Sequence, residues 1–265
     1  MRELFENIGG KPVVVQALCG VELRGCIRLE EPSVLNKPEA KEAMMLGKYS
    51  ICDSASQGIV TNCLLNAQSP ESMLEVCAGR GNKTIMFQSL ANEIFGRQLD
   101  LTTLDSVEKK TNVLRERGKR YGLNLSRTLT ADATSNTAFQ RVVGNAKFDV
   151  VFVDTPCSGL GTLRRHPELK WRLTTKKINQ LASTSFKILS NAAKHVAPGG
   201  ILTYSTCTVT KAENEEVVER FLTSPQGQKF KLISFKTQDK EFPYYRTITI
   251  SGLNDAHFSA CMRCS

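Results

Sequence analysis

The stretch FDVVFVDTPCSGLGTLRRHPELKW, residues 148–171, joins a continuous apolar run to a carboxylate, a thiol and a basic tail. The apolar run, residues 148–154, is typical of a strand that is buried on both faces of a parallel sheet. Pro156 and Gly159 then break the chain direction. Asp154 and Cys157 are therefore predicted at the carboxyl end of a core strand, which is where open α/β sheets bind their ligands.

Strand patterns and helix patterns alternate on both sides of this stretch. Repeated βα units predict an α/β fold with a doubly wound, mostly parallel Rossmann-like sheet and helices on both faces. The predicted strands cover residues 72–78, 99–105, 126–132, 148–154, 200–207, 230–235, the residues near 246–250, and 257–263. The predicted helices cover residues 83–95, 106–121, 137–144, 175–196 and 212–223.

Residues 1–48 have a different pattern. Short apolar runs surround Gly20 and Gly25, and the polar, proline-containing segment EPSVLNKPEAK follows at residues 31–41. We predict a short N-terminal α+β appendage over residues 1–48, which is a candidate for RNA contact, and a main domain over residues 49–265.

Composition narrows the function classes. The chain has 265 residues and a formal net charge of +9, which suggests a polyanionic partner, although a generally basic surface would give the same charge. No apolar run approaches the length of a membrane span, and the amino terminus lacks a signal-peptide pattern. We therefore expect a cytoplasmic protein without a membrane partner, and a monomer is favoured.

The nine cysteines do not suggest a disulfide framework, because their number is odd and the chain is not a short secreted one. Most are expected to be small core residues. Cys261 and Cys264 form a lone CxxC pair, and a zinc site would need a second pair at suitable spacing. The three histidines also lack the spacing of metal ligands, so we expect no metal.

A glycine-containing turn and three carboxylates mark one edge of the predicted sheet. LEVCAGRGNKT, residues 74–84, follows the first strand and opens a helix. Asp105, Asp132 and Asp154 end the next three strands, where a carboxylate can bind ribose hydroxyls. Any one of these aspartates could instead cap a helix. Together they indicate an adenosine-bearing cofactor, and the absence of a P-loop motif argues against a nucleoside triphosphatase.

Cys157 and Cys207 both follow strands that we predict to be neighbours, so their side chains are expected to share one pocket. A thiolate is a nucleophile, and a positive environment lowers the pKa of a thiol. The alternative interpretation is a pair of buried, inert thiols. The basic residues that could supply the positive environment, or contact phosphates, are Arg164, Arg165, Lys170 and Arg172. The alternative for this basic stretch is a solvated surface.

These segments carry a family resemblance. DTPCSGLGTLRRHPELKW (154–171) and YSTCTVTKAENEEVVERFL (204–222) resemble the fourth and sixth motifs of the RNA cytosine-5 methyltransferases of the bacterial Fmu/Sun type. LEVCAGRGNKT is similar to the cofactor loop of that family, DSASQGIV (53–60) to the segment before its domain, and DAHFSACMR (255–263) to its closing strand. The resemblance covers residues 49–265.

The resemblance implies a Rossmann-like methyltransferase sheet, S-adenosylmethionine as cofactor and a cytosine in ribosomal or transfer RNA as substrate. It implies that Asp105 holds the ribose, Asp132 lies on the adenine side and Asp154 lies between cofactor and base. The cofactor loop would be lined by Cys77, Ala78, Gly79, Arg80, Gly81, Asn82 and Lys83. Glu75, Gly79, Arg80 and Asn82 depart from the usual residues of that loop.

The resemblance also implies roles for the two thiols. Cys207 would attack carbon 6 of the base, which makes carbon 5 nucleophilic, and Cys157 would assist release of the product. The alternative is a non-catalytic RNA-binding or ribosome-assembly protein on a methyltransferase scaffold. Binding of the cofactor separates these two interpretations.

Overall fold

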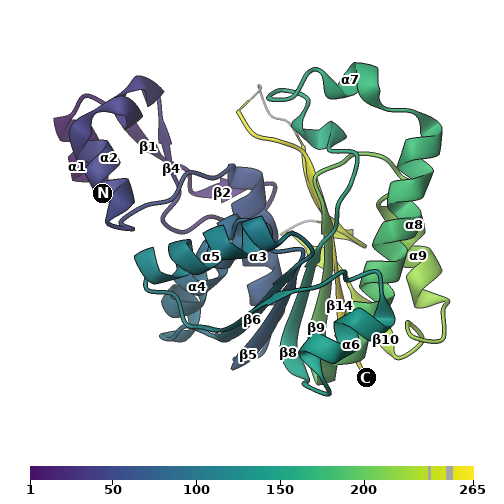
Figure 1. The fold of residues 1–265 in the computed structure, drawn as a ribbon. Coiled ribbons are helices and arrows are strands. Elements are labelled where there is room, and N and C mark those ends of the chain that lie inside the picture. Colours follow the sequence, from purple (N-terminus) through teal and green to yellow (C-terminus); the bar gives the residue numbers. More distant parts are fainter. Residues whose placement is uncertain (238–239, 249–252) are drawn as a thin grey trace.

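The computed structural model describes residues 1–237, 240–248 and 253–265, and it is built around one eight-stranded sheet (Figure 1). The strand order is β10-β14-β9-β8-β5-β6-β7, and β13 pairs with β14 outside this path. The strands are β5 (Ser72–Val76), β6 (Asp100–Asp105), β7 (Leu125–Thr130), β8 (Phe148–Asp154), β9 (Val196–Thr206), β10 (Phe230–Ile233), β13 (Tyr245–Thr247) and β14 (His257–Cys264).

Five neighbouring strands, β7, β6, β5, β8 and β9, run parallel, so the predicted mostly parallel sheet is confirmed. The closing strand β14 is antiparallel to β9 and to β10. The chain passes from β5 outward to β6 and β7, and then returns to place β8 on the other side of β5. The carboxyl ends of β5 and β8 therefore form a topological switch point, where sheets of this kind bind ligands.

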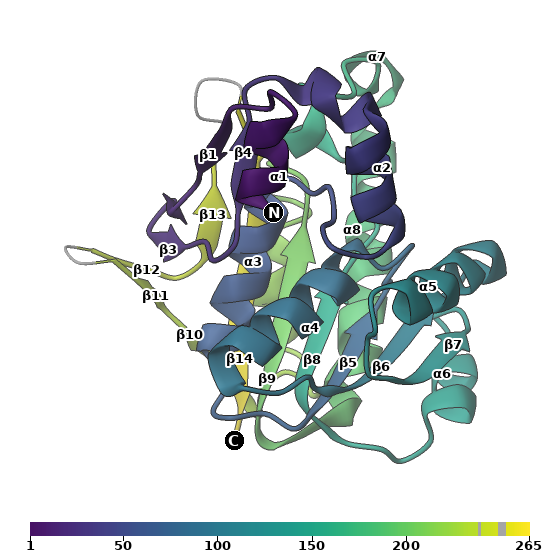
Figure 2. The same ribbon diagram turned by 90° about the vertical axis from the view of Figure 1, so that its left-hand side faces the viewer.

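Helices cover both faces of the sheet, as predicted (Figures 1 and 2). Consecutive residues of a strand point to opposite faces, so Val151 and Phe152 of β8 belong to two different apolar cores. The helices α3 (Ser54–Leu65), α4 (Asn82–Phe95) and α5 (Glu108–Arg120) lie on one face, and α6 (Asn136–Val143), α8 (Thr175–Ala192) and α9 (Glu215–Leu222) lie on the other.

The N-terminal segment is attached to the sheet domain by its second hairpin. Leu18, Val21 and Leu23 pack into the core beside α3, and the Tyr245 hydroxyl donates a hydrogen bond to the Leu18 carbonyl at 3.0 Å. Phe5 belongs instead to a small separate apolar cluster. The segment comprises α1 (Arg2–Asn7), β1 (Pro12–Val14), β2 (Ala17–Leu18), β3 (Val21–Glu22), β4 (Ile27–Leu29), the 3-10 helix η1 (Pro32–Asn36) and α2 (Pro38–Met45).

Some element ends differ from the predicted ones. Strand β7 ends at Thr130, so Asp132 lies two residues beyond it, in a turn. Helix α9 begins at residue 215 instead of 212, because the preceding residues form a turn that is held by side chains. Strand β9 begins at residue 196 and includes Pro198 and Gly199, which lie where the register with β8 shifts.

The segment that we predicted as strand 230–235 is two strands, because β10 ends at Ile233 and Phe235 pairs elsewhere. The shorter elements are β11 (Phe235–Lys236), β12 (Glu241–Phe242), α7 (Leu169–Arg172) and the 3-10 helices η2 (Leu160–Thr162) and η3 (Ala193–His195). The strand predicted near 246–250 corresponds in part to β13, and residues 249 and 250 lie outside the described residues.

Candidate active site

Cys157 and Cys207 come together at the carboxyl ends of the adjacent parallel strands β8 and β9. Their sulfur atoms are 3.4 Å apart, and the backbone N–H of Cys207 also donates to the Cys157 sulfur at 3.4 Å. Both side chains are half-buried. The structure thus brings the two sulfurs into contact, and the sequence-based expectation that they face one pocket stays a prediction.

A partly buried ion pair lies beside the sulfur pair. The Lys83 Nζ donates to the Asp154 carboxylate at 2.7 Å, and the two side chains are only 13% and 27% exposed. Lys83 stands in the first turn of α4, and Asp154 is the last residue of β8. The resemblance assigned Lys83 to the cofactor loop, and the structure adds that its ammonium group reaches across to β8.

The pKa values of the two thiols are shifted in opposite directions. The pKa of Cys207 is lowered, first by its hydrogen bond with Cys157 and to a lesser extent by the Lys83 ammonium group, against the opposing effects of burial and of the Asp154 carboxylate. The pKa of Cys157 is raised by the same hydrogen bond and by burial. Cys207 is therefore the sulfur that loses its proton first, and Cys157 is the thiol that donates to it. A nucleophile needs the thiolate form, so this arrangement favours Cys207.

A buried carboxylate ties together the two loops that carry the cysteines. Glu213 accepts hydrogen bonds from the Ser158 N–H at 2.7 Å and from the Ser158 hydroxyl at 2.6 Å. It also accepts from the hydroxyl of Thr210 at 2.7 Å and from that of Thr208 at 3.3 Å. Glu213 is fully buried. Because it bonds residues next to both cysteines, it fixes the position of one sulfur relative to the other.

Gly161 lets the backbone after β8 approach both Cys207 and the start of β14. Its N–H donates to the Cys207 carbonyl at 2.9 Å, and its carbonyl accepts from the Ala256 N–H at 2.9 Å. A Cβ atom at this position would lie 1.9 Å from the Ala256 carbonyl oxygen, so no other residue fits. The last strand of the sheet is thereby joined to the site.

The predicted cofactor loop follows β5 and has open space over it. Cys77 adopts a positive φ of 63°, and a Cβ atom at Gly79 would meet nothing within 4 Å. The Gly79 N–H donates to the buried carboxylate of Asp105 at 2.9 Å, and the same carboxylate accepts from the Val107 N–H at 2.9 Å. An open, glycine-containing turn with a fixed acidic group on the next strand fits an adenosine-bearing cofactor.

The residues that depart from the family pattern are accommodated at the edge of this loop. The Arg80 side chain is exposed, while its carbonyl accepts a hydrogen bond from Arg117 at 2.8 Å. Arg117 also donates to the Asn82 side chain at 2.6 Å. Glu75 is buried below the loop and accepts from the Thr84 hydroxyl, and burial raises the pKa of its carboxyl to about 8.

The remaining loop residues lie between these groups. Ala78 is buried, and its N–H donates to the Leu104 carbonyl at 3.1 Å. Gly81 caps the start of α4 with a positive φ of 83°. The Asp132 carboxylate accepts from the N–H and the hydroxyl of Thr134, so it stabilises its own turn.

The basic segment after β8 divides into two parts. Arg165 donates to the fully buried carboxylate of Asp255 at 2.9 Å, and Arg164 contacts both Asp255 and Asp53 at 3.2–3.3 Å. Lys170 and Arg172 lie on α7 and are free of such anchoring within the described residues. The sequence predicted all four as RNA contacts but not the partners of the two arginines.

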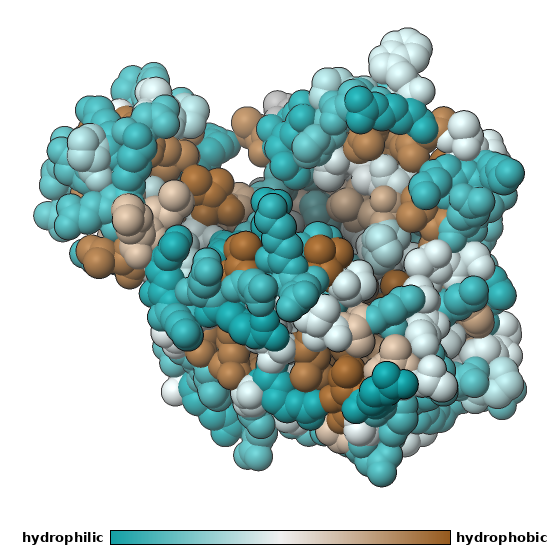
Figure 3. All heavy atoms as spheres, viewed as in Figure 1, coloured by the Kyte–Doolittle hydropathy of each residue, from teal (hydrophilic) through white to brown (hydrophobic). Residues whose placement is uncertain are grey.

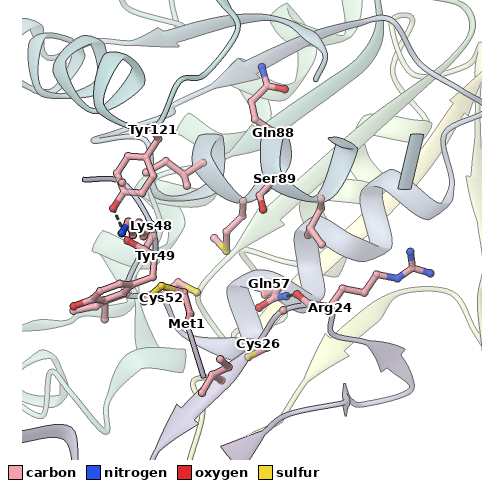
Figure 4. A pocket seen from close by; sticks show the side chains of 18 of the residues that line it. Met1, Arg24, Cys26, Lys48, Tyr49, Cys52, Gln57, Gln88, Ser89 and Tyr121 are labelled. Carbon is pink, nitrogen blue, oxygen red and sulfur yellow. Dashed lines mark hydrogen bonds between the residues drawn. The ribbon is translucent and has the colours of Figure 1, made fainter. Parts of the chain in front are cut away.

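A cavity of about 800 Å³ lies between the N-terminal segment and the sheet domain (Figure 4). Its lining includes Arg24, Lys48, Tyr49 and Tyr121, and it extends to Arg164. In Figure 3 the surface is hollowed between the N-terminal segment and the part of the chain that carries α7. The cavity is distinct from the sulfur pair, because neither cysteine of that pair lines it.

Several residues of the site were not predicted from the sequence. The roles of Glu213, Asp255 and Asp53 depend on contacts between distant segments, which no local pattern reveals. Within the described ranges, no group of three or more His, Cys, Asp or Glu side chains is arranged to hold a metal ion. No helix in the same ranges is long and apolar enough to cross a membrane.

Comparisons with known proteins show which family the chain resembles. Residues 62–259 match the family described as 16S rRNA methyltransferase RsmB/F. A probable ribosomal RNA small subunit methyltransferase B of Synechocystis is 34% identical over 195 residues, which is 69% of this chain and 42% of that protein. Its counterpart in Bacillus subtilis is 33% identical over 177 residues, 66% of this chain and 37% of that protein.

This chain thus spans about two fifths of the length of those two relatives. Among solved structures, NSun6 from Pyrococcus horikoshii with SFG superposes with a TM-score of 0.69 at 22% identity, over 90% of this chain and 59% of that one. That likeness supports the Rossmann-like fold. With a family model matching most of its length, the chain belongs to the 16S rRNA methyltransferase RsmB/F family.

Proposed function

We propose that this protein transfers a methyl group from S-adenosylmethionine to carbon 5 of a cytosine in RNA, with Cys207 as the covalent nucleophile. The observation that carries the proposal is the 3.4 Å sulfur contact between Cys207 and Cys157 beside the Lys83–Asp154 ion pair. In this pair the pKa of one thiol is lowered and that of the other is raised, and a partly buried ion pair lies next to them. This arrangement has no evident structural purpose, but it suits covalent catalysis.

The cofactor would occupy the open loop after β5, with Asp105 on the ribose and Asp132 on the adenine side, as the resemblance implies. Cys77, Ala78, Gly79, Arg80, Gly81, Asn82 and Lys83 would line it. When bound, S-adenosylmethionine supplies an electrophilic methyl group. The NSun6 structure, which has the same fold, contains SFG, an analogue of S-adenosylmethionine. This supports S-adenosylmethionine as the cofactor of this protein.

The residues of this chain then have separate roles. The Cys207 thiolate attacks carbon 6 of the base, and carbon 5 becomes enamine-like. Asp154, which is hydrogen-bonded to the Lys83 ammonium group, would share a proton with ring nitrogen 3 as charge develops there. The carbon 5 proton must then leave so that the bond to Cys207 can break, and Cys157 assists this elimination directly or through water.

Two single substitutions test these roles. Cys207→Ala should abolish both the covalent RNA adduct and methyl transfer from labelled S-adenosylmethionine. Cys157→Ala should instead accumulate the adduct, seen as a slower RNA–protein band on a denaturing gel. If Cys207→Ala retains 5-methylcytosine formation, or if no cellular RNA is methylated by the intact protein, the proposal is wrong. Calorimetry with S-adenosylmethionine distinguishes an enzyme from a purely RNA-binding protein, which need not bind the cofactor.

We further propose that RNA lies across α7 and the cavity beneath residues 1–48. Lys170 and Arg172 are exposed on α7, and Arg164 and Arg165 are held nearby by Asp255. The cavity combines cationic side chains with tyrosines, a combination that suits a single-stranded segment. The target base must also leave its stack to reach Cys207.

Charge reversal tests this interface. Lys48→Glu and Lys170→Glu should each weaken RNA binding and reduce the slope of log K against log salt by about 1 or more. Lys231→Glu makes the same charge change at an exposed position of the edge strand β10, which is in register with Arg263 and Ile201 at the end of the sheet away from Cys207, and serves as the control. Equal losses in all three variants would show that only net charge matters.

A further inference from the structure

The described cysteines differ in how close they lie to another sulfur and to solvent. The sulfurs of Cys157 and Cys207 are 3.4 Å apart, and neither residue is fully buried. A disulfide bond is about 2.0 Å long, so a shift of roughly 1.4 Å would join them. The backbone on either side is already fixed by Glu213.

We propose that Cys157 and Cys207 form an oxidation site, at which a peroxide converts the two thiols into a reversible disulfide. Formation of this bond needs no cofactor or RNA. Its consequence for activity rests on the proposed function, since the bond would remove the nucleophile. The cytoplasm predicted for this protein is reducing, so the disulfide would be transient there.

The chemistry balances in two steps. The Cys207 thiolate attacks one oxygen of hydrogen peroxide, so an S–O bond forms, the O–O bond breaks and hydroxide leaves. The sulfur loses two electrons and becomes a sulfenic acid. The Cys157 sulfur then attacks the Cys207 sulfur, the S–S bond forms, the S–O bond breaks, and the departing hydroxide takes up the Cys157 proton. In total, two thiols and one peroxide give one disulfide and two water molecules.

The arrangement favours this order of events. Cys207 has the lowered pKa and so provides the thiolate, which is the oxidisable form. Cys157 keeps its proton until it is needed and lies in contact as the resolving thiol. A resolving thiol in contact captures the sulfenic acid before a second peroxide can oxidise it to sulfinic acid.

The cysteines outside this pair that are compared below lack a lowered pKa. Cys63 and Cys261 are buried, and burial raises the pKa of Cys261 to about 11. Cys52 is exposed, but burial of its sulfur and the charge of Asp53 raise its pKa. The pKa of Cys26 is raised to about 11, mainly by burial and also by the nearby Cys52 and Asp53. We therefore expect the pair at the strand ends to react first.

Peptide mapping tests the proposal directly. Trypsin releases Cys157 in residues 148–164 and Cys207 in residues 195–211, and each peptide contains no other cysteine. The intact protein is treated with stoichiometric hydrogen peroxide, free thiols are blocked with N-ethylmaleimide, and the digest is analysed without reductant. We expect the two peptides joined, with a mass two hydrogens below their sum, and separated again by dithiothreitol.

Two variants make the result decisive. Cys157→Ser should give no joined peptide, and its Cys207 should be trapped by dimedone as a sulfenic acid. Cys52→Ser removes the exposed thiol and should leave the joined peptide unchanged. The inference is overturned if Cys207 is oxidised to sulfinic acid without the crosslink, or if Cys26 and Cys52 are joined while Cys157 and Cys207 remain alkylated.

The failure of this inference and the failure of the proposed function can be told apart. The mapping requires neither RNA nor S-adenosylmethionine, so it decides the disulfide even if no methyl transfer is found. If methyl transfer occurs but the crosslink is absent, only the oxidation site is wrong. If both hold, peroxide should abolish RNA adduct formation, and dithiothreitol should restore it.

Discussion

Two pairs of cysteines can be compared, one at the carboxyl edge of the sheet and one in the buried layer between the sheet and α3. Cys157 and Cys207 touch each other at the ends of β8 and β9. Cys63, on α3, and Cys261, on β14, lie on either side of Thr203, whose hydroxyl is 3.2 Å from one sulfur and 3.4 Å from the other. Both members of the interior pair are buried.

The difference teaches that position on the sheet, and not residue type, determines the chemistry of a thiol here. In the interior, burial raises the pKa of both Cys63 and Cys261, so these sulfurs remain protonated and act as small apolar side chains. At the edge, the contact with a second thiol, helped by the Lys83 ammonium group, lowers the pKa of Cys207 although burial and the Asp154 carboxylate oppose this. The following predictions test this contrast.

The largest expected difference concerns turnover. Cys207→Ala should lower the rate of methyl transfer by at least ~10³-fold, because the covalent route is lost. Cys261→Ala, the matched change in the interior pair, should leave the rate per folded molecule within a few fold. Both rates are measured with labelled S-adenosylmethionine and the same RNA. Similar losses in the two variants would mean that the edge thiol is not special.

The next difference concerns reactivity without substrate. At pH 7.5, iodoacetamide should alkylate Cys207 at least ~100 times faster than Cys261, because a thiol with a pKa of about 11 has very little thiolate at that pH and is also inaccessible. Mass spectrometry of peptides quenched at successive times gives both rates in one sample. A ratio near one would mean that the two thiols are equally reactive, against the prediction.

Substitution in the interior pair should reduce the stability of the fold more than substitution in the edge pair. Cys63→Ala removes a fully buried side chain and leaves a small cavity, so it should lower the free energy of unfolding by roughly 1–2 kcal/mol. Cys157→Ala changes a half-buried side chain and should cost under about 0.5 kcal/mol. Urea denaturation followed by circular dichroism measures both. A larger loss for Cys157→Ala would assign that thiol a mainly structural role.

The smallest expected effect concerns the pH dependence of Cys207. Its pKa is lowered in the folded protein, so alkylation should reach half its maximal rate at a pH below that of an ordinary thiol. Lys83→Met removes the nearby positive charge and should move that midpoint upward by roughly half a unit to one unit. A midpoint that stays in place would show that the contact with Cys157 alone accounts for the acidity.

The strands of the core were predictable because their sequences carry their own signal. The apolar run of β8 was predicted with its observed bounds, 148–154, since a strand buried on both faces needs consecutive apolar residues. The pairing of β8 with β9, and so the meeting of Cys157 and Cys207, followed from the alternation of strands and helices. The ends of elements were predicted less accurately. At β7, for example, a turn that is held by Asp132 replaces the last predicted strand residues.

The contacts that complete the site were not predictable, because they join segments that are far apart in the sequence. Lys83 and Asp154 are separated by 71 positions, and Arg165 and Asp255 by 90. The basic segment was interpreted as a surface for phosphates, but no local pattern distinguishes an arginine that faces solvent from one that binds a buried carboxylate. The composition of the segment could suggest a polyanionic partner, but it could not show which arginines bind carboxylates within the protein.

The position of β14 determines which segments must be in place before the backbone around the two sulfurs is fixed. The strand is inserted between β9 and β10, and Ala256, just before its start, bonds to Gly161, whose own N–H bonds to the Cys207 carbonyl. A segment about 50 positions beyond Cys207 therefore braces the turn in which that cysteine stands. Truncation before residue 256 would remove this brace and leave the loop after β8 without its contact to the sheet edge.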